Sequence, residues 1–324
     1  MDTDDVNTKV RVLANVYAEL ELFPWLKYRT EFGSDIVYSN HNTFFPSFER
    51  GNFFGKSGVR RSLNNSLFWI NKHLLTFNKT IGEDHNLTAL AGFEVQEGRF
   101  EWLFASRENL PTNDLQQLVL GDAGQQQNNG GAGHWALLSY FGRLNYAFKD
   151  RYLLTGTLRI DGSSRFGPNN RYGLFPSAAF AWRASSEEFF KSFDDLSNLK
   201  FRIGYGAVGN QEIGLYSYSA NLRSLNTVLG NQLITSFAPD NIANPDVKWE
   251  SSVQTNFGVD LGLFKNRLEV VLDYYIKKAD GMLLPALIPS TAGGLNPPFV
   301  NIGEIENRGL ELTVRTQNIS GKVN

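Results

Sequence analysis

The sequence predicts an all-β protein, namely a portion of an antiparallel, up-and-down transmembrane β-barrel with long extracellular loops and short periplasmic turns. Three observations support this prediction. Apolar and polar side chains alternate over many segments of about ten residues. The connections between these segments are alternately long and short. Aromatic residues make up 13% of the chain, and several lie next to the short connections, as in the aromatic girdles of barrels.

The clearest alternation lies between residues 138 and 183, where two unlike connections join three strands. Leu144 belongs to an apolar and aromatic set of side chains, and its neighbour Arg143 belongs to a polar set. A short turn at 149–151 follows the first strand, whereas a long connection at 162–173, rich in Gly, Ser, Pro and Asn, follows the second. One face of this segment is therefore apolar and the other carries arginines.

The first predicted strand covers residues 8–22, where apolar side chains occupy every second position. A helix would place Lys9 and Arg11 among those apolar side chains, so a helix is rejected. The same alternation predicts further strands near 26–32, 67–78, 87–96, 138–148, 152–161, 177–183, 200–207, 249–261, 268–276 and 306–316. This makes about eleven strands, and because closed bacterial single-chain barrels rarely have an odd number of strands, we expect an open partial barrel.

The connections divide into two sets by length. Long, polar or Gly-rich connections predict extracellular loops at 36–62, 98–135, 211–246 and 278–301. Short connections predict periplasmic turns at 23–25, 82–84, 149–151 and 264–267. Residues 185–188, Ser-Ser-Glu-Glu, resemble a capping box and predict one helical turn that ends near Lys191.

Composition excludes several classes of protein. A net charge of −2 gives no indication of a nucleic-acid partner. The chain contains no cysteine, so disulfides, thiolate metal sites and a cysteine nucleophile are excluded. No apolar run approaches the length of a transmembrane helix, and a negative mean hydropathy suits strands with one polar face. The acidic N-terminal segment 1–12 lacks the apolar core of a signal peptide.

No motif in the chain indicates an enzyme. Residues 204–209, GYGAVG, match a dinucleotide-binding fingerprint, but no helical pattern follows, and glycines on the polar face of a crowded barrel explain them better. The four histidines are scattered, with no spacing that would gather metal ligands. Ser163 and Ser164 lack the surroundings of a hydrolase nucleophile. We therefore predict no catalytic, cofactor-binding or metal-binding residues.

Several long segments resemble, in order, the barrel of the SusC/RagA family of TonB-dependent outer-membrane transporters. They are GRLNYAFKDRYLLTGTLRIDGSSRFG (142–167), RYGLFPSAAFAWR (171–183), RIGYGAVGNQEIG (202–214), NPDVKWESSVQTNFGVDLGLFKNRLEVVLDYYIKKADGMLL (244–284) and NIGEIENRGLELTV (301–314). The resemblance implies a bacterial outer-membrane importer of oligosaccharides or peptides. Its implied partners are membrane lipid, a SusD-like surface lipoprotein, TonB and a plug domain of the same protein. On this basis we expect residues 1–324 to be a partial barrel domain, with the plug domain and signal peptide absent.

Two groups of side chains are candidates for function. Arg143, Arg159, Arg183 and Arg202 fall on the polar set of successive strands and would form a positive lumen wall. They could pair with carboxylates such as Asp161 and Glu250, contact the plug domain, or bind substrate. The aromatic side chains that could stack on a sugar or peptide in the second long loop are Trp102, Phe104 and Trp135.

Two other classes remain open at this stage. A passive porin or adhesin barrel would show the same alternation without a plug or TonB. A soluble β-rich binding module would also alternate, although it has less reason for such long strands and such one-sided loops.

Overall fold

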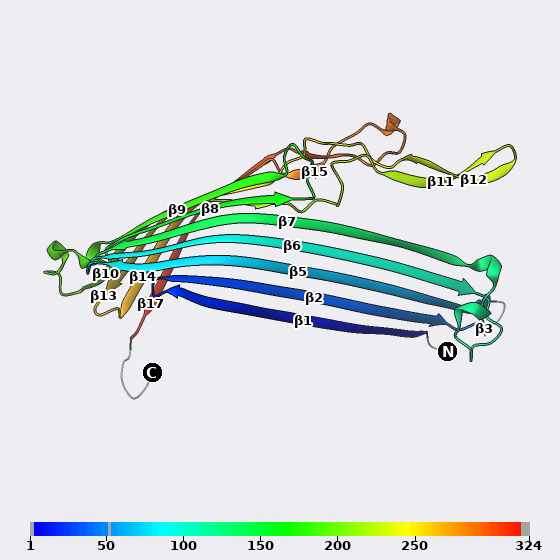
Figure 1. Cartoon of the computed structure of the whole chain (residues 1–324), viewed down its shortest axis with the longest axis horizontal. Coiled ribbons are helices and arrows are strands. Elements are labelled where there is room, and N and C mark those ends of the chain that lie inside the picture. The colour runs from blue at the N-terminus through cyan, green and yellow to red at the C-terminus, as the bar shows by residue number, and fades with distance from the viewer. Residues whose placement is uncertain (1–2, 51–52, 319–324) are drawn as a thin grey trace. The chain divides into compact units, whose positions relative to one another are not determined.

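The computed structural model describes residues 3–50 and 53–318, and most of them are in β-strands (Figure 1). Its largest sheet has 11 strands in the described part of the chain: β1 (Asp4–Phe23), β2 (Leu26–Phe45), β5 (Gly58–Ile81), β6 (His85–Glu108), β7 (Gln127–Phe148), β8 (Tyr152–Ser163), β9 (Tyr172–Arg183), β10 (Leu196–Asn210), β13 (Glu250–Leu263), β14 (Leu268–Asp280) and β17 (Glu304–Thr316). The strands follow one another across the sheet in chain order, with β1 and β17 at its edges. The predicted antiparallel, up-and-down topology is confirmed.

Three small hairpins and five short 3₁₀ turns make up the rest of the regular structure in residues 3–50 and 53–318. The hairpins pair β3 (Phe48–Arg50) with β4 (Phe53–Gly55), β11 (Leu222–Leu229) with β12 (Gln232–Pro239), and β15 (Leu283–Pro285) with β16 (Phe299–Asn301). The 3₁₀ turns are η1 (Leu118–Leu120), η2 (Ala123–Gln125), η3 (Ala184–Ser186), η4 (Glu188–Phe190) and η5 (Ser290–Ala292). Within the described ranges, no helix has the length and apolar character needed to cross a membrane.

Several predicted boundaries are wrong. The expected loop at 98–135 begins and ends as strand, because β6 continues to Glu108 and β7 already starts at Gln127. Backbone hydrogen bonds hold a ladder together even where side-chain alternation fades, which is why the sequence pattern misses these extensions. The expected capping box also fails: residues 184–190 form two 3₁₀ turns, and neither has a side-chain cap.

The described chain divides into two compact units, each with its own buried cluster. The first unit comprises Met1–Ala18, Thr30–Lys72 and Val95–Ala136. The second unit comprises Glu19–Arg29, His73–Glu94 and Leu137–Asn324. In the first unit the buried cluster contains Phe44, Val59 and Leu110, with Leu118 packed against it.

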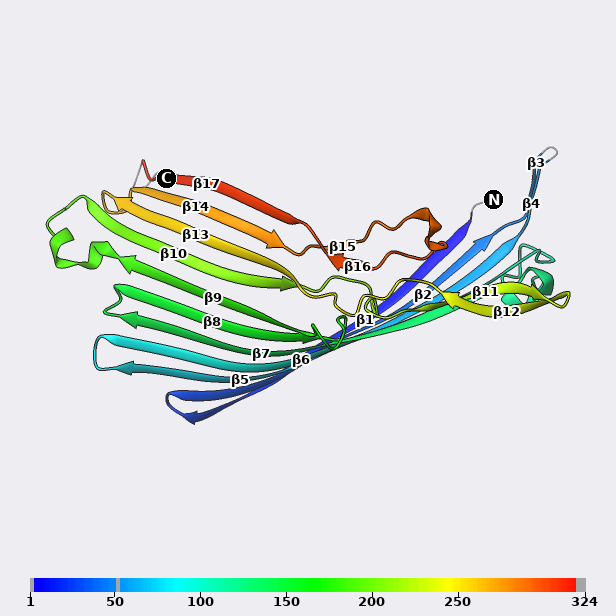
Figure 2. The same cartoon turned by 90° about the horizontal axis from the view of Figure 1, so that it is seen from above.

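In the second unit, residues of the long connections form a small, mainly aromatic cluster. Phe166 and Val247 are fully buried, and Trp249 packs beside them. The Trp249 ring lies 5.1 Å from the Phe166 ring and 5.4 Å, edge-on, from the Phe175 ring. Figure 2 shows β8, β9, β10, β13, β14 and β17 side by side in this unit. The long connections therefore have a packed core of their own.

The short turns use left-handed backbone conformations. Lys149 and Asp150 both have positive φ angles, 53° and 52°, as do Gly230 and Asn231 between β11 and β12, at 59° and 62°. Two successive residues of this kind suit a type I′ turn, whose twist matches that of the flanking strands. The turn at 149–151 can therefore connect β7 directly to β8.

Gly209 provides a test of the aromatic cluster. A Cβ atom at this position would overlap the Phe175 ring, so Gly209→Val should cost about 1–3 kcal/mol of stability through overpacking. Gly156→Val is the matched control, because no atom lies within 4 Å of a Cβ placed there. Urea unfolding in detergent micelles, followed by tryptophan fluorescence, should show a lower midpoint for Gly209→Val alone. Equal midpoints for the two variants would contradict this packing.

Candidate functional site on the polar face of the sheet

The register of the second unit separates two chemically different faces. Residues that lie opposite each other in an antiparallel ladder share a face. One such row, which lies on what we call the apolar face, runs across seven strands through Tyr146, Leu154, Phe180, Ile203, Phe257, Tyr274 and Leu310. The adjacent row, on what we call the polar face, contains Asn145, Thr155, Ala179, Gly204, Asn256, Tyr275 and Gly309.

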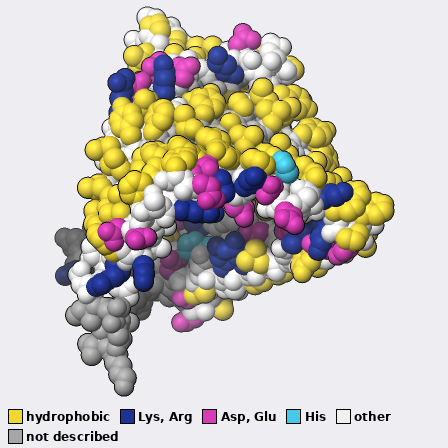
Figure 3. All heavy atoms as spheres, turned by 90° about the vertical axis from the view of Figure 1, so that its left-hand side faces the viewer, with side chains coloured by type: hydrophobic (Ala, Val, Ile, Leu, Met, Phe, Trp, Pro, Cys, Tyr) yellow, Lys and Arg dark blue, Asp and Glu magenta, His cyan; other side chains and the backbone are white. Residues whose placement is uncertain are grey.

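The apolar face is open in the structure. Leu154, Phe257 and Leu310 are 45%, 45% and 68% exposed, although large apolar side chains are normally buried. Figure 3 shows hydrophobic side chains gathered over one area of the surface, with most of the visible Lys, Arg, Asp and Glu side chains gathered elsewhere. An apolar surface that is continuous over several strands requires a nonaqueous neighbour.

Arg159 is the centre of one charged network on the polar face. Its Nε atom donates to both carboxylate oxygens of Asp161 at 2.8 Å. Its Nη2 atom donates to the Ser139 hydroxyl at 2.8 Å and to Glu94 at 3.4 Å. Its guanidinium carbon also lies 5.3 Å from the centre of the Phe141 ring. Ser139, Asp161 and Glu94 are all buried. Because Glu94 is on β6, Ser139 on β7 and Arg159 on β8, this arginine connects three neighbouring strands of the sheet.

Arg202 forms a second network across three other strands. From β10 its Nη2 atom contacts Asp260 on β13 at 2.7 Å and Asp273 on β14 at 3.0 Å. Gly258 lies directly opposite Arg202 in the ladder, and a Cβ atom there would be 2.6 Å from the guanidinium carbon. The glycine therefore allows the guanidinium to lie flat against the sheet between two carboxylates.

Arg143 and Arg183 lie on the same face but have no carboxylate partner among the described residues. Arg143 donates only to the neighbouring Asn145 side chain, at 3.2 Å. Arg183 lies opposite Lys200 in the ladder between β9 and β10, so two cations are adjacent there. The structure thus places all four arginines predicted from the sequence on one face, but only two of them are neutralised within the sheet.

The sequence pattern did not identify Asp260 and Asp273 as partners of Arg202. It also suggested Glu250 as a partner of the arginines, and this prediction is wrong. Glu250 accepts a hydrogen bond from the Asn210 side chain at 3.4 Å and from the Leu283 backbone at 3.3 Å, rather than from an arginine. Asp260 and Asp273 carry the same alternation signal as the arginines, but only the register shows that both lie near Arg202, one on β13 and the other on β14.

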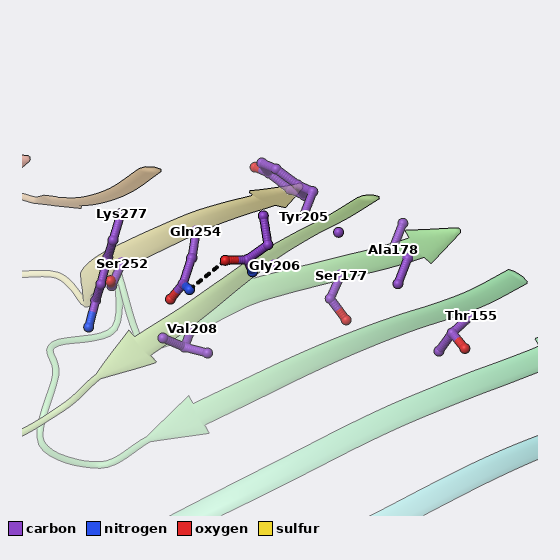
Figure 4. Close-up of a pocket in the computed structure, with 12 residues that line it drawn as sticks. Thr155, Ser177, Ala178, Tyr205, Gly206, Val208, Ser252, Gln254 and Lys277 are labelled. Atoms are coloured by element: carbon purple, nitrogen blue, oxygen red, sulfur yellow. Dashed lines mark hydrogen bonds between the residues drawn. The ribbon is translucent and has the colours of Figure 1, made fainter. Parts of the chain in front are cut away.

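A shallow trough lies between the two charged networks on the polar face. Its floor is made of small side chains from β8, β9 and β10: Thr155, Ser177, Ala179, Gly204 and Gly206. Gln254 and Lys277 lie at its side, and Gln254 donates to Asn256 at 2.8 Å (Figure 4). Because the floor carries no bulky side chain, another polypeptide or a ligand can approach the backbone closely here.

The three candidate aromatic residues lie in strands of the first unit, not in a loop. Trp102 and Phe104 on β6 stack with ring centres 6.3 Å apart, and Trp135 on β7 stacks on Phe68 at 5.9 Å. Arg60 lies 4.5 Å from the centre of the Phe104 ring. Trp102 also lines a cleft together with residues 130–132 and 63–65 of the neighbouring strands. The expectation of loop aromatics is therefore wrong, although Trp102 does border an open cleft.

The four histidines contact tyrosine hydroxyls or carboxylates. His73 and His85 lie 2.6 and 2.7 Å from the hydroxyls of Tyr28 and Tyr146. His41 pairs with Asp5 and His134 with Glu97. Among the described residues, no group of three or more His, Asp or Glu side chains is placed to hold a metal ion.

Comparison with known proteins connects this geometry to one group. The sequence profile of the family described as TonB dependent receptor-like, beta-barrel, matches residues 3–322. The chain is 35% identical to TonB-dependent receptor P3 of Formosa agariphila, over 95% of this chain and 31% of that protein. It is 38% identical to TonB-dependent receptor SusC of Bacteroides thetaiotaomicron, over 57% of this chain and 19% of that protein.

Solved structures show the same similarity. The RagAB peptide importer in its closed-closed state matches with a TM-score of 0.91 and 26% identity, over 99% of this chain and 35% of that chain. Its open-open state matches with a TM-score of 0.90. The chain spans less than a third of the length of the curated relatives that it matches.

The Arg202 network should be necessary for stability. Arg202→Met leaves Asp260 and Asp273 partly buried and without their cation, which should cost about 1–3 kcal/mol. Arg202→Lys keeps the charge but not the planar fork, so its loss should be smaller. Arg183→Met is the control on the same face and should change little. Urea midpoints in detergent micelles measure all three, and an equal loss for Arg183→Met would refute a specific role for the network.

Proposed function

Because the chain belongs to the TonB-dependent receptor-like β-barrel family, we propose that it forms part of the barrel wall of an outer-membrane importer of oligosaccharides or peptides. The observation that carries this proposal is the family match over residues 3–322, which contain a sheet with one apolar and one polar face. The RagAB importer, whose structure resembles this chain, is a peptide importer, and this supports a peptide or a similar polymer as cargo.

The proposal assigns each face an environment. The apolar row through Leu154, Phe257 and Leu310 would face lipid, where apolar side chains are favoured. The polar row, with Arg159 and Arg202, would face the lumen. Strands β8, β9, β10, β13, β14 and β17 have 12 to 15 residues, and about 9–11 residues suffice to cross a bilayer when tilted.

The arginines would have two different roles in this arrangement. Arg159 and Arg202 neutralise carboxylates of the wall itself, so their role is structural. Arg143 and Arg183 would be available to carboxylates of a plug domain, which would also approach the trough of small side chains. Direct contact with substrate ranks below these two roles, because lumen charges on the strands are usually satisfied by protein groups.

Further partners follow from the same proposal. A surface lipoprotein of the SusD type would cover the extracellular opening, and TonB would couple import to the proton-motive force on the periplasmic side. Trp102 lines an open cleft and is therefore, of the three candidate aromatic side chains, the one best placed to stack on a sugar ring or a peptide.

Paired spin labels test the assignment of the faces. Residues 1–324 contain no cysteine, so single cysteines at Leu154 and Thr155 can each be labelled in the complete membrane-embedded protein once any cysteine outside this range has been replaced. We expect the label at 154 to collide mainly with lipid-soluble oxygen, and the label at 155 with a water-soluble nickel complex, since a shift of one residue exchanges the two faces. Phe257 and Asn256 provide an independent pair, and the reverse accessibility in both pairs would refute the assignment.

Genetic deletion tests the proposed import. Removing the gene for the complete protein should abolish growth of the host on its oligosaccharide or peptide cargo, and removing TonB should have the same effect, because import against a gradient needs energy. Growth on free monosaccharides or amino acids is the control. Uptake that persists without TonB would instead identify a passive pore.

A further inference from the structure

One connection at the short-turn end of the second unit differs from the others. The turns after β1, β5, β7 and β13 are brief, whereas residues 184–195 between β9 and β10 include the 3₁₀ turns η3 and η4 (Figures 1 and 2). We call residues 184–195 the β9–β10 connection. Its sequence, ASSEEFFKSFDD, combines three phenylalanines with charged side chains, which a simple polar turn does not require.

The three phenylalanines form a surface cluster in which Phe190 is half-buried and the other two are exposed. Phe190 lies between the other two, with ring centres 4.8 Å from Phe189 and 6.1 Å from Phe193. Phe189 is 62% exposed and Phe193 is 60% exposed. Three large apolar rings held together at the surface of a short connection need a neighbour that is not water.

Glu187 fastens this connection to the apolar face. Its carboxylate accepts hydrogen bonds from the Tyr152 hydroxyl at 2.7 Å, from Trp182 Nε1 at 3.2 Å and from Arg151 Nη1 at 2.9 Å. Glu187 is itself buried, and the bonds from Tyr152 and Trp182, with that from Arg151, lower the pKa of its carboxyl, so it remains ionised at neutral pH. The next residue, Glu188, is exposed, pairs with Lys191 at 2.7 Å and lies 3.9 Å from Arg151, but does not contact Tyr152 or Trp182.

The two ring donors to Glu187 belong to the apolar face. Tyr152 and Trp182 lie opposite each other in the ladder between β8 and β9, two positions from Leu154 and Phe180 of the apolar row. Their neighbours on this face are also aromatic: Tyr152 stacks on Phe148 at 6.2 Å, and Trp182 stacks on Phe201 at 5.7 Å. Such a belt, with apolar rings and polar tips, is typical of the boundary between lipid and water.

We propose that Phe189, Phe190 and Phe193 insert into the interfacial layer of the phospholipid leaflet at the short-turn end, and that Glu187 holds the connection at that depth. The cluster lies on the connection that Glu187 joins to the aromatic belt of the apolar face, which favours phospholipid over a protein partner as its neighbour. Lys191, on the same connection, would remain among the headgroups and water, as basic side chains do at an interface. The proposal rests on the transmembrane arrangement proposed above.

Depth measurements on the complete protein in nanodiscs of phosphatidylethanolamine and phosphatidylglycerol test the insertion. Single cysteines at Phe189 and at Phe193 are spin-labelled one at a time, which leaves the other two phenylalanines in place. The controls are a label at Lys265, in the short turn between β13 and β14, and a label at Leu154, which reports independently whether the barrel is in the membrane.

We expect the labels at 189 and 193 to be at least threefold more accessible to oxygen, relative to the nickel complex, than the label at 265. Labels at 189 and 193 that are as water-accessible as the one at 265 would overturn the proposal. Shielding from both reagents would also overturn it, because this would identify a protein neighbour. If the label at 154 were water-accessible as well, the transmembrane arrangement itself would have failed.

A second pair of variants tests the role of Glu187. Glu187→Ala removes the acceptor shared by Tyr152, Trp182 and Arg151, and should make the label at 193 water-accessible while the label at 154 stays in lipid. Glu188→Ala is the matched control, since its carboxylate does not contact either ring, and should leave the label at 193 unchanged. An unchanged depth in Glu187→Ala would show that Glu187 does not position the cluster.

Discussion

The constraint on which the rest of the structure depends is the pairing of backbone groups between neighbouring antiparallel strands. In hydrocarbon each unpaired N–H or C=O group costs several kcal/mol, so every strand inside the sheet must bond to both neighbours. A ladder of this kind directs successive side chains to opposite faces and opposite residues to the same face. The choice of face in β8 therefore determines the choice in β9, β10, β13, β14 and β17, and a single register produces both the apolar row and the polar row.

Two of the four arginines on the polar face are neutralised by carboxylates of the same sheet. Arg159 and Arg202 each hold two carboxylates, and each network joins three successive strands. Paired charges of this kind add specificity to the register, because a shift by one residue would move the arginine and its partners to the apolar face. What remains open is the positive pair of Arg183 and Lys200 and the floor of small side chains. In the proposed importer these two features would receive the plug domain of the same protein.

The two ends of the second unit meet different physical demands. The long connections, which would lie in water in the proposed arrangement, are stabilised by a small core of their own around Phe166 and Trp249. The short-turn end instead presents rings with polar tips, and Glu187 gathers the tips of Tyr152 and Trp182 at one carboxylate. Aromatic side chains at the long-connection end therefore pack against each other. Those at the short-turn end remain exposed, either on the apolar face or on the β9–β10 connection.

The sequence by itself determined the fold class, the strand order and the division into two faces, because all three depend on a period of two that is local to each strand. It also placed Arg143, Arg159, Arg183 and Arg202 on one face, and it excluded a nucleotide-binding loop at 204–209, which the structure shows as part of β10. Only the tertiary structure decided which carboxylates neutralise which arginines, since Asp260 and Asp273 reach Arg202 through cross-strand register. It alone showed that Trp102, Phe104 and Trp135 belong to strands, and that Glu187 binds the aromatic belt instead of capping a helix. The physical reason is that alternation reports the direction of a side chain, whereas its partners are set by pairing with residues distant in the chain.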